Sequence, residues 1–244
     1  MGRSLLLADV HANLRALEAV LLDARRGDGF DSIWMLGDLV GYGPEPDECV
    51  ARLREHPLVC VAGNHDLGVV GDIDLSRFNP DAATACLWSR RRLSASSIRF
   101  LRELPLEYHL PPFLLVHGSP RDPVWEYVVS PGDALLLASF CDETHCLTGH
   151  THRSCAYRMV AGPALASTSG LLGLEVVLDG RLIINPGAVG QPRDGDPRAA
   201  YAVLDSDAKT VTFRRVAYDV CGTAADMLRN GLPVALARRL HAGG

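Results

Sequence analysis

The feature that most constrains this chain is an apolar run that stops at a glycine and an aspartate. Residues 33–36 precede Gly37-Asp38, which is the pattern of a buried strand that ends at a site. A carboxylate there has two oxygens and can hold two cations at once. We therefore expect a fold that brings this stretch together with four others that carry metal-ligating side chains: Asp9-Val10-His11, Gly63-Asn64-His65-Asp66, His117-Gly118 and Gly149-His150-Thr151-His152.

The first quarter of the chain predicts alternating strands and helices. Strands are expected at residues 5–8, 33–36 and 58–62, and helices at 13–24 and 49–55, the first of which has an apolar stripe. A ligand-bearing stretch follows each strand. Right-handed crossovers between parallel strands would place these strand ends side by side at one edge of a sheet.

The rest of the chain predicts a helical segment and then many strands. Residues 71–80 are expected to form a loop and 81–104 to be helical, so that 71–105 is a candidate helical cap over the site. A short helix is expected at 131–140 and two more at the end of the chain. Strands are expected at 113–116, 144–147, 155–161, 174–178 and 181–184, with a hairpin turn at Asp179-Gly180, and at 201–204 and 211–216 as a last hairpin. This many strands favours two sheets packed face to face, with helices outside, in one domain spanning 1–244.

Composition narrows the partners and the compartment. The formal net charge is 24 − 29 = −5, so a nucleic-acid backbone is an unfavourable partner. No apolar run is long enough to cross a bilayer, and no secretory segment precedes the first strand. The seven cysteines are scattered, which predicts reduced thiols in a cytoplasmic protein. A zinc knuckle from Cys141, His145 and Cys146 is an alternative, although its spacing fits no common zinc module.

The candidate ligands predict a two-metal centre. Imidazole, carboxylate and amide oxygen together suit divalent ions, with Mn²⁺ expected first and Fe, Zn, Ni, Co or Mg as alternatives. Two such ions bind phosphate oxygens and activate a water as hydroxide, the nucleophile of a phosphoester hydrolysis. His65 is expected to protonate the leaving group as general acid, with Asp66 orienting its imidazole. The seven predicted ligands are Asp9, His11, Asp38, Asn64, His117, His150 and His152, with Asp38 bridging the two metals.

Each of these stretches also has a structural interpretation. Gly-Asp at a strand end is commonly a turn, Gly-Asn-His-Asp contains turn-forming residues, and a single histidine such as His117 is more often part of a core. Gly-His-Thr-His is the most specific, and five such signals in order at strand ends favour the metal interpretation. The remaining histidines are assigned to structure or surface: His56, His109, His145 and His241.

Through these same five stretches the chain resembles the calcineurin-like metallophosphoesterase superfamily, in particular its small bacterial and archaeal phosphodiesterase branch. The resemblance implies an α/β fold, a four-layer α/β/β/α sandwich of two mixed sheets, with His65 as the catalytic histidine. It also implies that one metal is held by Asp9, His11, Asp38 and His152, and the other by Asp38, Asn64, His117 and His150.

The chain departs from the phosphatases of this superfamily after Asp38. Those proteins continue with Asp-Arg-Gly, whereas Gly41 and Tyr42 stand at the aspartate and arginine positions here. Arg193, in the polar loop 185–198, is a candidate to replace the missing phosphate-binding arginine, and a salt bridge to Asp194 or Asp196 is the equal alternative. Asn13 and Arg193 are assigned to substrate binding. The arginines at 90–92, 99 and 102 are interpreted as a solvated helix face, with contact to an anionic substrate as the alternative.

The sequence thus predicts an enzyme that hydrolyses a small phosphodiester or nucleotide. Within the same class, the alternatives are a phosphomonoesterase and a nucleoside or dinucleoside polyphosphate hydrolase. The alternative from another class is a metal-binding scaffold of the same fold. Retention of His65 with the seven ligands favours the enzyme, because an unused cluster of this kind gains nothing from stability alone.

Overall fold

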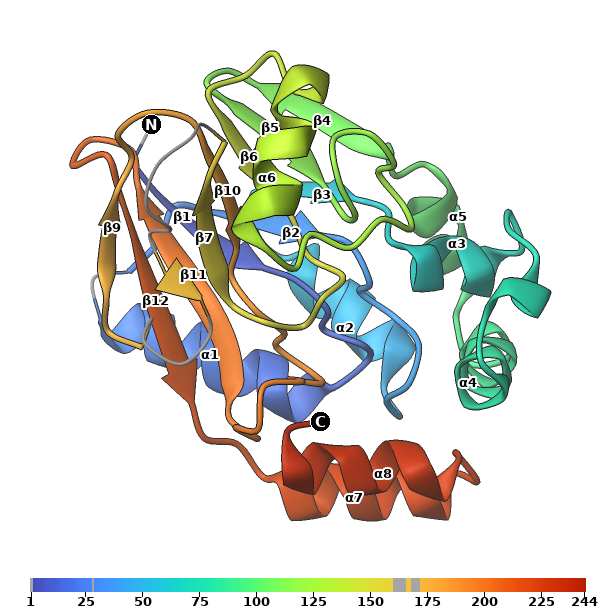
Figure 1. The fold of residues 1–244 in the computed structure, drawn as a ribbon. Coiled ribbons are helices and arrows are strands. Elements are labelled where there is room, and N and C mark those ends of the chain that lie inside the picture. Colours follow the sequence, from blue (N-terminus) through green and yellow to red (C-terminus); the bar gives the residue numbers. More distant parts are fainter. Residues whose placement is uncertain (1, 28, 160–165, 168–171) are drawn as a thin grey trace.

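Two six-stranded mixed sheets form the centre of the protein. A computed structural model describes residues 2–27, 29–159, 166–167 and 172–244 (Figure 1). The first sheet has the order β3-β2-β1-β11-β12-β9. Its strands are β1 (Arg3–Leu7), β2 (Ser32–Leu36), β3 (Leu58–Val61), β9 (Glu175–Val177), β11 (Ala199–Asp205) and β12 (Thr210–Val216). Since β1, β2 and β3 are parallel, the predicted side-by-side placement of their carboxyl ends is confirmed.

The second sheet has the order β4-β5-β6-β10-β7-β8. Its parallel centre is β5, β6 and β10, and antiparallel strands flank it on both sides. Its strands are β4 (Glu107–Leu110), β5 (Phe113–Val116), β6 (His145–Leu147), β7 (Cys155–Arg158), β8 (Ala166–Ser167) and β10 (Leu182–Asn185). The predicted strand 155–161 extends beyond β7 into residues that lie outside the described ranges.

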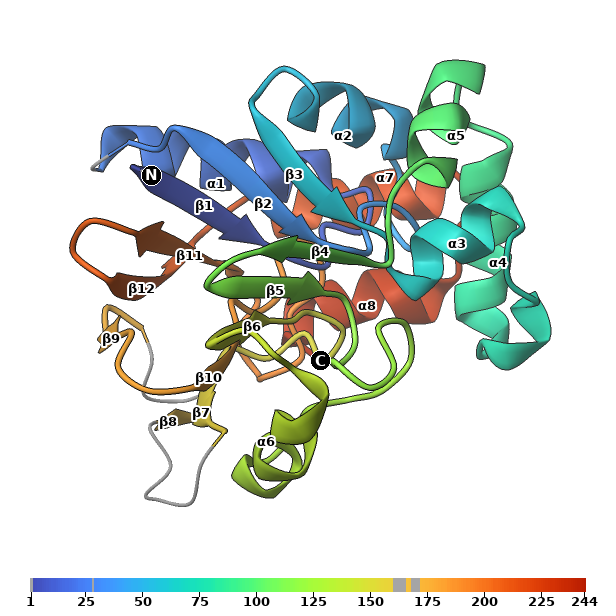
Figure 2. The same cartoon turned by 90° about the horizontal axis from the view of Figure 1, so that it is seen from above.

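Three apolar layers hold the sheets and helices together. Alternate residues of the strands, such as Leu6 and Leu36 of the first sheet and Leu115 and Ile184 of the second, fill the space between the sheets. Helices α1 (Leu14–Arg26) and α2 (Pro46–Leu53) cover the outer face of the first sheet. Helix α6 (Pro131–Leu137), followed by the 3-10 turn η2 (Ala138–Phe140), covers the second (Figure 2). The predicted α/β/β/α sandwich is confirmed.

The segment after β3 is more helical than predicted. Helix α3 (Asn64–Val70) begins inside the Gly-Asn-His-Asp stretch, and a 3-10 turn, η1 (Leu75–Arg77), lies within the predicted loop 71–80. The helical segment predicted at 81–104 is confirmed, and it consists of two helices, α4 (Pro80–Arg90) and α5 (Ala95–Arg102). Ser94 caps α5 by accepting a hydrogen bond from the Ser97 amide, so a new helix starts there after the break at 91–94.

The hairpin predicted at Asp179-Gly180 is wrong. The strands on either side of it, β9 and β10, exist but belong to different sheets. Strand β9 pairs with β12, whereas β10 pairs with β6 and β7. The turn therefore carries the chain from one sheet to the other. In contrast, β11 and β12 form the predicted last hairpin, and helices α7 (Val220–Arg229) and α8 (Val234–Ala242) follow it.

The zinc knuckle is not supported by the orientation of its residues. Neighbouring residues of a strand point to opposite faces. In β6, Cys146 packs in the core beneath α6 together with Cys141, whereas the His145 ring lies 5.3 Å from the ring of Phe113 in the layer between the sheets. All seven cysteines lie among the described residues and are free thiols. Within the described ranges, no helix combines the length and the apolar character that crossing a membrane requires.

Candidate metal centre

The predicted ligands lie at the carboxyl ends of five strands from both sheets. Asp9 and His11 follow β1, Asp38 follows β2, and Asn64 follows β3 as the first residue of α3. His117 follows β5, and His150 and His152 follow β6. The backbone there is unusual, because five of these seven residues have positive φ: Asp9 (54°), His11 (47°), Asp38 (57°), His150 (66°) and His152 (57°). Such backbone costs on the order of 1–3 kcal/mol per residue and gathers at functional sites.

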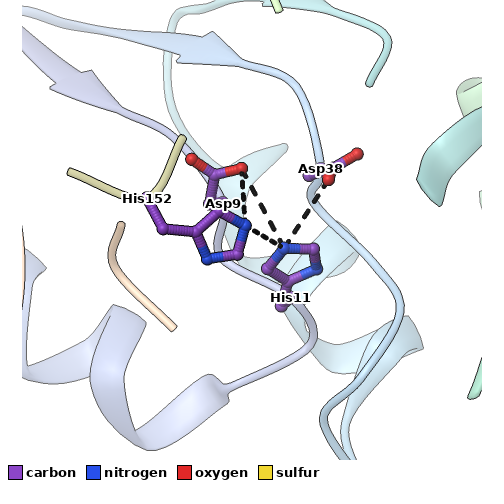
Figure 3. Close-up of side chains that lie close together, drawn as sticks. All are labelled: Asp9, His11, Asp38 and His152. Carbon is purple, nitrogen blue, oxygen red and sulfur yellow. Dashed lines mark hydrogen bonds and ion pairs between the residues drawn. The ribbon is translucent and has the colours of Figure 1, made fainter. Parts of the chain in front are cut away.

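The first ligand group consists of Asp9, His11, Asp38 and His152 (Figure 3). Their side chains point toward one another, and one ligand atom of each lies within 4.8 Å of the others. Nε2 of His152 is 3.4 Å from Oδ1 of Asp9, and Nε2 of His11 is 3.6 Å from Oδ2 of Asp38. All four residues are buried. This is the same set that the resemblance implied for one metal.

The second group contains Asp38, His117 and His150, so Asp38 belongs to both. Its Oδ2 lies 3.4 Å from Nε2 of His117. The same Nε2 is 3.0 Å from Nδ1 of His150 and 3.1 Å from Oδ1 of Asn64. The structure therefore brings all four residues implied for the other metal to one place.

In their neutral forms the four imidazoles direct lone pairs into these groups. In each ring the other nitrogen lies within hydrogen-bond distance of a carbonyl oxygen, which can only accept, so that nitrogen carries the proton. The partners are the carbonyls of Val40 for His11, Leu36 for His117, Trp125 for His150 and Gln191 for His152. The facing nitrogens of His11 and His152 are only 3.2 Å apart. Two lone pairs at this distance repel each other unless a cation lies between them, which is the arrangement a metal requires.

The electrostatics of the centre also suit a bound cation. Both oxygens of Asp9 are buried and have no hydrogen-bond partner within the described structure. Burial raises the pKa of Asp9 to about 8, and nearby Asp38 adds to the effect. Burial opposes the charge of His117, but Asp38 outweighs it and raises the pKa of His117 to about 9. Asp38 itself keeps a pKa well below its usual value despite burial, because His117 and His65 stabilise its charge. The residues present therefore fit divalent metals.

His65 lies beside the centre, but Asp66 does not orient it. Both oxygens of Asp66 accept backbone hydrogen bonds, from Val40 at 3.1 Å and from Gly63 at 3.0 Å. Asp66 therefore holds the start of α3 against the Asp38 loop, and the predicted pairing with the His65 imidazole is wrong. Successive side chains on a helix do not face each other, which explains the difference.

A thiol from α4 approaches His65 instead. Sγ of Cys86 lies 3.4 Å from Nδ1 of His65, and burial raises the pKa of this thiol, which stays neutral. Gly41 leaves the space for the ring, because a Cβ there would lie 2.4 Å from the same Nδ1. The amide of His65 donates to Oδ1 of Asp38 at 2.8 Å. Burial lowers the pKa of the imidazole to about 4.

The two predicted substrate-binding residues have different surroundings. Asn13 caps α1, and its amide donates to the Gly190 carbonyl at 2.9 Å. It is buried and does not line the pocket above the centre, so the structure gives it a structural role. Arg193 does line this pocket. The two carboxylates that were alternative partners of Arg193 pair with other arginines: Asp194 with Arg215, and Asp196 with Arg198.

The pocket has a volume of about 430 Å³ and contains residues that the sequence did not single out. Asp38, Asn64, His65, His150 and His152 form part of its lining. The predicted arginine cluster at 90–102 does not line it. Arg90 and Arg102 instead donate to carbonyls of α3. Several lining residues that sequence reasoning missed come from distant parts of the chain, among them Arg77, Phe78, Trp125, Tyr127, Arg153 and Arg239.

The fold and this centre define an α/β/β/α protein whose buried Asp and His residues suit divalent metals. Residues 3–209 match the family described as the calcineurin-like phosphoesterase superfamily domain, and the chain belongs to this superfamily. The resemblance noted in the sequence is thereby confirmed. Membership supports a hydrolase that acts on phosphoesters.

Three relatives indicate how far the similarity extends. A metallophosphoesterase from Sphaerobacter thermophilus is 46% identical, with a TM-score of 0.89 over 100% of this chain and 99% of its own. An uncharacterized protein of Methanocaldococcus jannaschii is 35% identical over 97% of this chain and 96% of its own. A symmetrical bis(5'-nucleosyl)-tetraphosphatase of Pseudomonas putida is 40% identical over 63 residues, which are 25% of this chain and 22% of its own.

Proposed function

We propose that the protein is a two-metal phosphoesterase that hydrolyses a small phosphodiester or nucleotide in the cytoplasm. The observation that carries this proposal is Asp38, whose carboxylate belongs to both ligand groups at the floor of a pocket. Two divalent cations held there, Mn²⁺ being the first to test, supply Lewis acidity toward the phosphoryl group and activate a water as nucleophile. Asp9, His11 and His152 would hold one cation with Asp38. Asn64, His117 and His150 would hold the other with Asp38.

The remaining steps belong to the side chains of the pocket. His65 lines it next to Asn64, and its Nδ1 faces Cys86, which leaves Nε2 for the substrate. We assign Nε2 the proton that the leaving oxygen takes as the bond from phosphorus to that oxygen breaks. The anionic substrate favours the charged imidazole and so offsets the effect of burial. Asp66 contributes by fixing the start of α3, from which His65 projects.

Substrate and metal are tested together. Protein loaded with Mn²⁺ is expected to bind close to two ions per chain and to hydrolyse bis(p-nitrophenyl) phosphate. A panel of cyclic nucleotides, dinucleoside polyphosphates and phosphomonoesters then separates the diesterase from a monoesterase or polyphosphate hydrolase. Binding of metal without turnover of any member would overturn the proposal in favour of a metal-binding scaffold.

Arg193 is proposed to bind a phosphoryl oxygen. Its guanidinium donates to Gln191 at 3.1 Å and approaches the Tyr42 hydroxyl at 3.4 Å, while its Nε is buried and has no partner within the described structure. A guanidinium offers two parallel donors that an ammonium lacks. Arg193→Lys is therefore expected to lower kcat/KM about tenfold or more, with unchanged metal content and melting temperature. Arg198→Lys is the control. If Arg193→Lys kept the wild-type kcat/KM, Arg193 would have only a structural role.

Cys86 is proposed as the positioning residue for His65. It is the side chain that contacts Nδ1, from a different helix. Removing one weak hydrogen bond of roughly 1 kcal/mol in Cys86→Ala should lower kcat about fivefold on alkyl esters, whose leaving groups need a proton. The loss should be smaller on p-nitrophenyl esters and partly restored in Cys86→Ser. Equal losses on both substrates, together with a lower melting temperature, would show that Cys86 only packs.

A further inference from the structure

Four arginines from separate parts of the chain line the pocket above the ligand groups. Arg77 lies in η1, Arg153 directly follows His152, Arg193 is in the loop after β10, and Arg239 is on α8. Among the described lining residues, Asp38 on the floor is the single Asp or Glu. A protein with a net charge of −5 thus concentrates positive charge at one opening. Such a concentration attracts anions and favours ligands with several negative charges.

These four arginines lack the carboxylate partners that other arginines of the chain have. Within the described ranges, no Asp or Glu oxygen lies within 4.0 Å of the guanidinium of Arg77, Arg153, Arg193 or Arg239. By comparison, Arg15, Arg121 and Arg215 form ion pairs with carboxylates. Arg153 is held in place by donating from Nε to the Arg193 carbonyl at 2.8 Å. Cations gathered without a carboxylate in contact repel one another unless an anion joins them.

One phosphodiester does not account for this charge. A diester group carries a single negative charge, and two divalent cations with Arg193 still exceed it after the carboxylates of Asp9 and Asp38 are subtracted. Arg153 and Arg239 are then free to bind a second anionic group. The volume of the pocket, about 430 Å³, lies in the range of small-molecule sites.

Aromatic residues line the same pocket. The guanidinium of Arg77 lies 4.2 Å from the ring centre of Trp125, and Phe78 meets the same indole at 5.2 Å. The Tyr127 ring stacks on His150 at 4.1 Å with 10° between the planes, and the residue is 49% exposed. The carbonyl of Trp125 accepts from Nε2 of His150, so this aromatic loop is fixed to the metal centre. Exposed rings such as that of Tyr127 stack on nucleobases, and the half-buried indole of Trp125 lines the same pocket.

We infer that the substrate is a nucleotide containing at least two linked phosphates, with the second phosphate bound by Arg153 and Arg239 and the base stacked near Trp125 and Tyr127. This inference rests on the proposed function and names its substrate class. Water attacks the scissile phosphorus and gives up one proton to solvent as the new P–O bond forms, and the P–O bond to the bridging oxygen breaks. The bridging oxygen keeps the electron pair and takes the proton of His65.

Competition measures the contribution of the second phosphate. AMP, ADP, ATP and pyrophosphate are tested as inhibitors of bis(p-nitrophenyl) phosphate hydrolysis at constant free Mn²⁺. ADP is expected to bind at least about tenfold more tightly than AMP, because it gains charge-assisted hydrogen bonds to guanidinium groups. It should also bind more tightly than pyrophosphate, since the base adds stacking. Equal inhibition constants for AMP and ADP would overturn the inference.

Variants locate the second phosphate. In the double variant Arg153→Gln/Arg239→Gln the preference for ADP over AMP should fall to about twofold or less, because neutral amides replace both charges. Hydrolysis of bis(p-nitrophenyl) phosphate, which has one phosphate, should fall by much less than the affinity for ADP. Arg229→Gln, which alters an exposed arginine paired with Asp226 on α7, is the control. An unchanged ADP preference in the double variant would exclude these two arginines.

Tryptophan fluorescence tests binding separately from turnover. ADP is expected to quench the emission of Trp125 at lower concentrations than AMP does, and Trp125→Phe should remove the response. If the protein hydrolysed no phosphoester, the proposed function would fail, but this difference between ADP and AMP would still support the binding site. If it hydrolysed diesters while AMP and ADP quenched alike, the inference alone would fail.

Discussion

Protein with Asp38→Asn is expected to lose both metal ions or nearly both, and with them activity on every phosphoester. The reason is geometric, because Asp38 is the residue common to the two ligand groups. Asparagine tolerates the positive φ of 57° at this position and keeps an oxygen for the His65 amide, but it removes the charge that would hold two cations. Metal analysis after dialysis against Mn²⁺ measures the loss directly.

Two comparisons make this result specific. Asp38→Ala removes the oxygens as well and should give the same loss, while Asp74→Ala, in an exposed turn, should keep the wild-type metal content. Circular dichroism in the presence of chelator shows whether each variant folds without metal. A folded Asp38→Asn protein that still binds two ions with unchanged affinity would exclude the bridging role.

His65→Ala is expected to keep its metal and its fold but to lose about 10²–10⁴-fold in kcat on esters with alkyl leaving groups. An alkoxide needs a proton as it departs, and Nε2 of His65 is assigned to give it. The loss should be much smaller for p-nitrophenolate, which hardly needs a proton. Comparing the two leaving groups in the same variant therefore measures proton donation separately from positioning.

His109→Ala provides the matched control for this variant. His109 is exposed and pairs with Glu143 at 2.6 Å on the second sheet, so its removal should leave kcat unchanged. His65→Asn tests whether a polar side chain that donates a hydrogen bond, but cannot transfer a proton, restores any of the activity lost in His65→Ala. Equal losses on the two leaving groups in His65→Ala would assign His65 to positioning the substrate.

The ligand positions could be predicted from the sequence because parallel strands share a carboxyl edge. Once residues 33–36 and 58–62 are identified as parallel strands, the side chains that follow them have to lie at one edge of the sheet. His117 and His150 needed more, since they come from the second sheet. Only the order of the five stretches, and the family they resemble, indicated that the two edges face the same space.

Features set by tertiary contacts could not be predicted in the same way. Asp179-Gly180 has the local signature of a hairpin, but the hydrophobic layer between the sheets draws its two strands apart. Asp66 is next to His65 in sequence, yet the helix points it toward the backbone of Val40. The pocket arginines lie between positions 77 and 239, with no spacing that would connect them before the fold is known.

The division of the ligands between two sheets has a consequence for stability. Asp9 and His11 come from the first sheet and His152 from the second, so any cation held by all three joins the two halves of the sandwich. Binding of this kind belongs to the folded state alone and adds about 2.7 kcal/mol to the free energy of unfolding when the free ion is at 100 times its dissociation constant. The melting temperature is therefore expected to rise as the concentration of free metal is increased. The ions would then hold the two sheets together as well as serve the reaction. As the free metal concentration falls toward the dissociation constant, the free energy of unfolding would fall before much of the activity is lost.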